Sequence, residues 1–277
     1  MSLSTAARSV AFIIAAQAGL LGMLSNAEAR YVDCPDIHLT GTDKVVVGDL
    51  TVASNTGASA TINQTRLKNA LRQQLSDLKV SEGGEIGIAG CPPGHQPEKA
   101  EIKPAYVSSI FASGAVLEIW GLATDSEAQM DYVLVPLLPP IRPGEKPDGF
   151  YAITYSFGSE TAFKKIFKES LELRAFALLG TGLRALADAP AAPSAEAGQT
   201  YGNAYKVLCR AHDFLMQAKA HPGGDDGSIP GKEWDALISL ALASANDAGE
   251  KTPKLQDVVL KDCVVKPPVA RAEAPPQ

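Results

Sequence analysis

The chain has 277 residues, a formal net charge of −6 at pH 7 and 45% hydrophobic residues, which is the composition of an ordinary globular protein. Its mildly acidic balance and its lack of basic clusters argue against nucleic acid and anionic lipid as partners. The length is sufficient for two small domains, each with its own core.

Residues 1–29 have the pattern of a cleaved export signal. Arg8 supplies the positive start, residues 10–23 form an apolar run too short to span a bilayer, and residues 27–29 (Ala-Glu-Ala) form a small-residue cleavage site. An uncleaved membrane anchor is the alternative. The pattern predicts a periplasmic or secreted protein with no integral membrane segment after cleavage.

All four cysteines follow the predicted signal, which indicates two disulfides in an exported protein. Three pairings are possible, and the local one joins Cys34 to Cys91 and Cys209 to Cys263. Each bond would close a loop of about fifty residues and add roughly 3 to 4 kcal/mol to stability. Four buried free thiols are the alternative, because Cys is also a small apolar residue.

A strand, a helix and a second strand are predicted near the start of the mature chain. Residues 43–52 and 85–89 carry the strand patterns, and residues 62–78 carry Leu at helical spacing. This order favours a right-handed crossover if the two strands are parallel.

A β-hairpin is predicted at the centre of the first domain. Residues 115–123 and 132–138 are apolar runs separated by a polar segment. Both faces of the first run are mostly apolar, as in a strand that is covered on two sides. A short helix over residues 105–113, with Gly114 as its C-terminal cap, precedes the hairpin, and a last strand at residues 150–157 follows it.

After residue 158 the hydrophobic period becomes that of helices. A helix capped by Ser159 is predicted to run to about residue 187, and an Ala/Pro-rich linker follows at residues 190–198. Two further helices are predicted at residues 199–220 and 232–247. The fold class is therefore α+β and multidomain, with these predicted parts: a signal peptide at 1–29, a small sandwich-like α/β domain with a central β-hairpin at 30–157, an all-α helical domain at 158–266 and a disordered tail at 267–277.

Residues 180–185 match the string G-x-G-x-x-A. Such a string cradles a pyrophosphate when it follows a strand and opens a helix. Here the preceding residues belong to a long helical period, and no second strand is predicted before the linker. Nucleotide binding at this string is kept as a third hypothesis, behind the two given below.

The same region resembles the tetratricopeptide repeat over about residues 160–221. Two sets of residues carry the resemblance. The helix A positions are Leu179, Gly180 and Leu183. The segment YGNAYKVLCRA follows the helix B pattern Y-x-x-A-x-x-x-L-x-x-A with Tyr201, Ala204, Leu208 and Ala211. Two departures are the long predicted connection at residues 190–198 and the late closing Pro222. The resemblance implies a helical hairpin array whose helix A surface binds a protein segment. An ordinary helical bundle with Ala in its contacts would show the same pattern.

The predicted hairpin holds the remaining candidate site. Glu118 is an acidic residue on an otherwise apolar strand, where it could serve acid–base chemistry or simply be a structural hydrogen-bonding group. Glu118, Trp120 and Tyr132 could together line one face of the hairpin as an interaction surface. The dispersed histidines, including His212 beside Asp213, form no complete metal or catalytic set, so no metal, cofactor or catalytic residue is predicted.

These patterns predict an exported protein of a bacterial envelope that acts as a non-enzymatic binding or scaffolding module. Its partner would be an envelope protein or peptide. The alternative is a periplasmic enzyme or small-ligand-binding protein with its site between the sheet and the first long helix.

Overall fold

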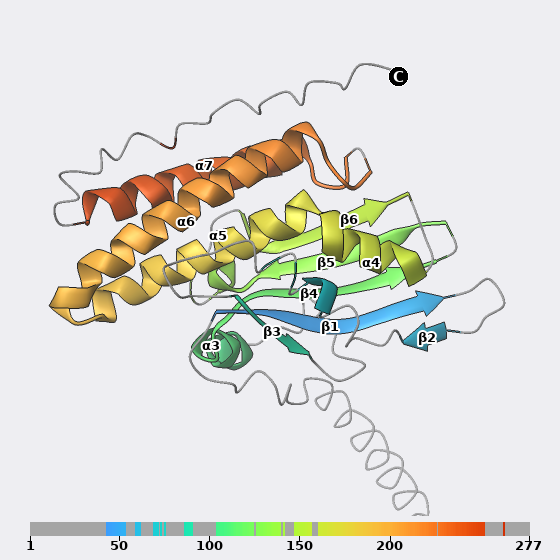
Figure 1. The fold of residues 1–277 in the computed structure, drawn as a ribbon, viewed down its shortest axis with the longest axis horizontal. Helices are drawn as coiled ribbons and strands as arrows, with labels where there is room; N and C mark the ends of the chain where they lie inside the picture. The colour runs from blue at the N-terminus through green and yellow to red at the C-terminus, as the bar shows by residue number, and fades with distance from the viewer. Residues whose placement is uncertain are drawn as a thin grey trace, which may run out of the picture.

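A computed structural model describes residues 43–53, 59–61, 69–71, 73, 75, 86–90, 104–124, 126–139, 141, 147–156, 160–225, 227–252 and 263. In these residues a mixed sheet from the first half of the chain packs against helices from the second half, which confirms the predicted α+β class (Figure 1). The predicted signal at residues 1–29, the predicted tail at 267–277, Cys34, Cys91 and Ser159 lie outside the described residues.

Among the described residues the sheet has six strands: five in the order β2-β1-β4-β5-β6, and β3, which also pairs with β1. The strands are β1 (Lys44–Ala53), β2 (Ser59–Thr61), β3 (Gly87–Gly90), β4 (Ala115–Ala123), β5 (Ala128–Leu134) and β6 (Phe150–Tyr155). β1 runs parallel to β3, which is the condition that the sequence analysis set for a right-handed crossover, and it also runs parallel to β4; the other pairs are antiparallel. The described residues of the predicted helix at 62–78 are helical, and Leu71 and Leu75 are buried.

The hairpin has a shorter turn than the sequence analysis predicted. β4 has the predicted bounds, whereas β5 begins at Ala128 because Thr124 closes the chain reversal early. The Thr124 amide donates to the Glu127 carbonyl at 2.8 Å, and the Glu127 amide donates to Thr124 Oγ1 at 3.2 Å. At the other end, Pro136 lies in the short 3-10 helix η3 (Val135–Leu137) instead of the strand, because Pro cannot donate to a sheet ladder.

The helices are α3 (Pro104–Ala112), α4 (Glu160–Glu169), α5 (Leu171–Asp188), the 3-10 turn η4 (Ala189–Ala191), α6 (Ser194–Ala220) and α7 (Gly231–Glu250). α3 ends at Ala112, and Gly114 follows with a φ of 97°, the left-handed conformation expected just after a helix C-terminus. α6 starts inside the predicted linker at residues 190–198, so that prediction is wrong beyond Pro193. Residues after Pro193 are mostly good helix formers, and Pro is tolerated just before a first helical turn.

The predicted single helix from residue 159 to about 187 is interrupted at Ser170. Ser170 has extended backbone angles, and its Oγ accepts a hydrogen bond from the Leu173 amide at 3.1 Å. It is therefore the N-cap of a new helix, α5. The apolar period continues through the break at Ser170, because α4 and α5 pack on the same sheet face. Periodicity alone therefore does not reveal the break.

Helices cover both faces of the sheet (Figure 1). α4 and α5 lie on one face with α6 and α7 outside them, and α3 lies on the opposite face. The ring of Phe176 on α5 lies 5.1 Å from Tyr132, 5.2 Å from Tyr151 and 6.1 Å from Trp234 on α7, measured between ring centroids. One hydrophobic core therefore continues from the sheet to α7, across the boundary predicted at residue 157.

Candidate functional site

Glu118 lies beneath α3 and is 1% exposed. The pairing places it in one row with Val46 on β1, Val133 on β5 and Phe150 on β6. Its Oε1 accepts a hydrogen bond from the Tyr106 hydroxyl of α3 at 2.8 Å. This carboxylate therefore helps to hold α3 on the sheet, which is the structural role considered for it from the sequence.

The prediction that Tyr132 shares a face with Glu118 and Trp120 is wrong. Tyr132 pairs with Ile119, so it points to the other side of the sheet, where it is fully buried against Phe176. Its hydroxyl lies 3.2 Å from the Tyr155 hydroxyl. Burial, together with the neighbouring Tyr155 and Glu172, raises the pKa of the Tyr132 hydroxyl well above its usual value. Tyr132 is thus a core residue that keeps its proton.

Trp120 lies on the α3 side of the sheet, beyond the part that α3 covers. It is half-buried, and Leu122, two residues further on, is 47% exposed. Their cross-strand neighbours on β5 are Asp131 and Gln129. The Gln129 amide donates to both carboxylate oxygens of Asp131, at 3.0 and 3.3 Å, and burial raises the pKa of that carboxyl. Of the predicted triplet, Trp120 is the member at the surface.

Glu172 forms a buried polar site that sequence reasoning missed. It is fully buried in the first turn of α5, where the helix dipole favours a negative charge. Its Oε2 accepts from the Ser170 hydroxyl at 2.8 Å, and its Oε1 accepts from the Gly223 amide at 2.6 Å. Glu172 therefore fastens the loop between α6 and α7 to the beginning of α5.

The loop between α6 and α7 also covers the edge of β6. The Asp225 amide donates to the Thr154 carbonyl at 2.6 Å, and the Thr154 amide donates to Ser228 Oγ at 3.1 Å. A Cβ on Gly224 would overlap the side chain of Ile153. Edge strands with free backbone groups are prone to pair with other chains, and this loop covers part of that edge.

Loss of the Ser228 hydroxyl is expected to loosen this cover. Ser228→Ala removes the acceptor of the Thr154 amide, and we expect the free energy of unfolding to fall by about 1 kcal/mol. Hydrogen exchange at Thr154 should become faster. The matched control is Ser239→Ala on the exposed side of α7, which should leave that exchange rate unchanged. Equal exchange at Thr154 in both variants would contradict the assigned contact.

Gly180 and Gly182 let α5 approach two neighbours closely. A Cβ on Gly180 would overlap the backbone carbonyl of Val116 on β4, and one on Gly182 would lie 2.6 Å from Leu208 Cγ on α6. α5 is continuous through this string, so no helix N-terminus is present there to bind a phosphate, and the nucleotide hypothesis is excluded. Of the other tetratricopeptide-like positions, Tyr201 is half-buried. The rest are buried, namely Leu179, Leu183, Ala204, Leu208 and Ala211.

A charged cluster joins β1, α3 and α5 at Arg184. Its Nε lies 3.3 Å from Asp43 Oδ1 and 3.3 Å from Asp188 Oδ2, and its guanidinium lies 4.6 Å from the centroid of the Phe111 ring. Arg184 also donates to the Phe111 carbonyl, and Lys44 Nζ donates to the Ser113 carbonyl at 2.6 Å. Burial raises the pKa of Asp43 to about 6, because it outweighs the attraction of Arg184.

Asp43 is expected to make the protein less stable as the pH rises from about 4 to about 6. In this window the folded state retains a proton that the unfolded state, with a pKa of 3.8, has already lost. We expect this group to lower the free energy of unfolding by about 2 kcal/mol across the window. Urea unfolding of the wild type and Asp43→Asn at pH 4, 5, 6 and 7 measures the difference. Asp235→Asn, at an exposed ion pair, is the control and should retain the wild-type dependence on pH.

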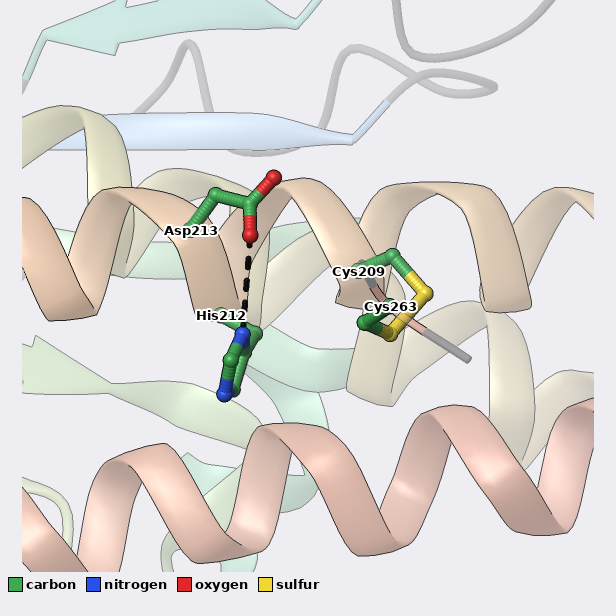
Figure 2. Close-up of a disulfide and its surroundings, with 4 residues drawn as sticks. All are labelled: Cys209, His212, Asp213 and Cys263. Atoms are coloured by element: carbon green, nitrogen blue, oxygen red, sulfur yellow. Dashed lines mark ion pairs between the residues drawn. A yellow bond between two sulfur atoms is a disulfide. The ribbon is translucent and has the colours of Figure 1, made fainter. Parts of the chain in front are cut away.

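The predicted bond between Cys209 and Cys263 is confirmed, with a Cα–Cα distance of 5.3 Å (Figure 2). It ties a residue near the C-terminus to the middle of α6. His212 lies one turn further along α6, with Nδ1 3.6 Å from Asp213 Oδ1, and its side chain extends towards α7 (Figure 2). This pair forms an ion pair only when the imidazole is protonated, and its members are sequence neighbours on one helix.

In the part of the chain that the structure describes, no group of three or more His, Cys, Asp or Glu side chains could hold a metal ion. No helix among the same residues is long and apolar enough to cross a bilayer. Comparison with family models, curated proteins and solved structures finds no match to this chain.

Proposed function

We propose that this protein is an exported envelope protein, periplasmic or secreted, that binds a protein or peptide partner without catalysing a reaction. The observation that carries the proposal is that two buried carboxylates have structural roles, whereas apolar side chains are exposed on the sheet. Glu118 and Glu172 are buried and hydrogen-bonded to the fold, whereas Trp120 and Leu122 stand at the surface of β4. Apolar side chains at a surface, with an aromatic residue among them, are typical of interfaces.

Two features support export. Residues 1–29 combine a positive start, a short apolar run and a small-residue cleavage site. The disulfide between Cys209 and Cys263 is the kind of bond that persists in an oxidising compartment. Both features are expected of a protein that works in the envelope.

The helical half serves as the scaffold in this proposal. α5 and α6 pack against each other, with the Gly182 backbone close to Leu208, and this packing supports the resemblance to the tetratricopeptide repeat. α5 offers little open surface, however, because its residues 173–183 are buried except Arg174, and its exposed residues, Ala187 and Asp188, lie at its C-terminal end. We therefore place the partner on the sheet and not on the helix A surface.

The alternative is an enzyme or small-ligand receptor with a site between the sheet and a long helix. Such a site needs room for a ligand in that layer. There Tyr132 packs edge-on against Phe176 and Tyr151 stacks on it, and Leu71 and Leu75 of the predicted first helix belong to the same apolar core. Apolar packing of this kind favours the binding module over the alternative.

Crosslinking in intact cells tests the proposal. The tagged full-length chain is expressed in its own host, crosslinked with a membrane-permeant amine-reactive reagent and purified under denaturing conditions. We expect a mature chain that begins at Arg30 and a defined crosslinked partner. A chain lacking residues 1–29 is the control, and it should lose that partner because it is not exported. Absence of any specific partner from the exported chain would contradict the proposed function.

A further inference from the structure

One half of the sheet face that carries α3 is open. α3 and η3 cover Val46 and Val133, which are fully buried and pack with Val135 of η3. Further along the same face, side chains from four adjacent strands are exposed or half-buried. These are Thr51 on β1, Trp120 and Leu122 on β4, Gln129 and Asp131 on β5, and Ala152 and Thr154 on β6. We call these seven residues the open sheet face.

The open sheet face combines apolar surface with acidic charge. Leu122 is 47% exposed, whereas most large apolar side chains of the described strands are buried. The only charged member of the face is Asp131, and Glu127 in the adjoining turn is exposed and also acidic. None of the seven residues is basic, so this surface complements a partner that is apolar and positively charged.

Trp120 and Asp131 form the part of this face best suited to a cation. They are direct cross-strand partners, so their Cβ atoms lie about 5 Å apart. An indole face attracts a guanidinium or ammonium group, and a carboxylate beside it adds a charge-assisted hydrogen bond. Asp131 is already partly desolvated in the free protein, so the binding of a cation adds little to that cost.

We propose that the open sheet face binds a basic, apolar peptide segment of a partner protein, with an Arg or Lys side chain held between Trp120 and Asp131 and an apolar side chain against Leu122. This inference rests on the proposed function and specifies its partner. The apolar contact supplies affinity, and the cation fixes the position of the segment.

Fluorescence anisotropy with the mature protein tests this proposal. The probe is a short fluorescein-labelled peptide in which Val and Arg alternate, and the comparison peptides replace Arg by Glu or Val by Gly. We expect the Val/Arg peptide to bind at least about tenfold more tightly than either comparison peptide. Asp131→Asn and Leu122→Ser should each weaken binding about fivefold or more.

Met216→Ser is the matched control, because among the described residues Met216 is the other large apolar side chain that is strongly exposed, and it lies on α6. It should leave peptide binding unchanged. Unfolding curves of all variants must match the wild type, since the open sheet face contributes little to the core. The proposal is overturned if the Val/Arg peptide binds Asp131→Asn as tightly as it binds the wild type. It is also overturned if the peptide with Glu in place of Arg binds the wild type as tightly as the Val/Arg peptide does.

A photocrosslinker placed at Leu122, with one at Met216 for comparison, separates this inference from the proposed function. Crosslinking in cells at Leu122 to a segment rich in Arg or Lys supports both. A partner that is captured by the amine-reactive reagent but not from Leu122 leaves the proposed function intact and overturns this site. Crosslinking from Leu122 to a second copy of this chain, or to lipid, also overturns it.

Discussion

Gly180→Ala is expected to lower the free energy of unfolding by about 3 kcal/mol. The new Cβ would overlap the Val116 carbonyl, which belongs to the backbone of a central strand and cannot rotate away. Overpacking of a closed contact costs about 1 to 3 kcal/mol, and here the backbone of α5 or β4 must also shift. Urea unfolding monitored by circular dichroism measures the loss.

Two other glycines provide graded controls for this result. Gly231→Ala lies at the first residue of α7 with no atom near the new Cβ, and it should be neutral or stabilise by up to about 1 kcal/mol. Gly182→Ala meets the Leu208 side chain, which can partly adjust, and it should fall between the other two. If Gly180→Ala were as stable as Gly231→Ala, the close approach of α5 to β4 would be wrong.

Glu172→Ala is expected to lower the free energy of unfolding by about 3 to 4 kcal/mol. It leaves the Gly223 amide without its acceptor and the Ser170 hydroxyl without its carboxylate, and hydrogen bonds to a charged group are worth about 1.5 to 3 kcal/mol each. Hydrogen exchange at Gly223 should accelerate by more than the global loss of stability explains. Urea unfolding and exchange mass spectrometry together measure both effects.

Glu172→Gln separates the hydrogen bonds from the charge. Its carbonyl can still accept from Gly223 and its amide can donate to Ser170, so we expect a smaller loss, about 1 to 2 kcal/mol. Glu196→Ala, at an exposed position in the first turn of α6, is the control and should cost about 0.5 kcal/mol. Equal losses in Glu172→Ala and Glu196→Ala would show that the buried network does not hold the loop.

Local patterns in the sequence were sufficient for several elements of the fold. The apolar, β-branched run of β4 predicts its bounds, and Gly114 predicts the end of α3. The early start of β5 could also have been found, because residues 128–131 (Ala-Gln-Met-Asp) alternate apolar and polar as a strand with one covered face does. The polar residues in that run also fit a turn, which is where the sequence analysis predicts them.

Other features depend on contacts between segments that are distant in the sequence. In the sequence Glu172 has the pattern of a solvent-facing residue of a helix, but Gly223, 51 positions later, returns and donates its backbone amide to the Glu172 carboxylate. The string at residues 180–185 has the letters of a phosphate loop, but its glycines serve the approach of α5 to β4 and α6. No local period contains that information, because the partner surfaces come from other elements.

The sequence by itself determined the class of the fold and the type of most elements, and it indicated two disulfides while leaving their pairing open. These depend on the side-chain period within one segment and on the count of cysteines. Only the tertiary structure decided that Tyr132 is buried, that Glu172 is sealed by a loop and that the sheet face at Trp120 and Leu122 is open. Strand register and helix coverage decide which side chains reach water, and both are set by packing between segments.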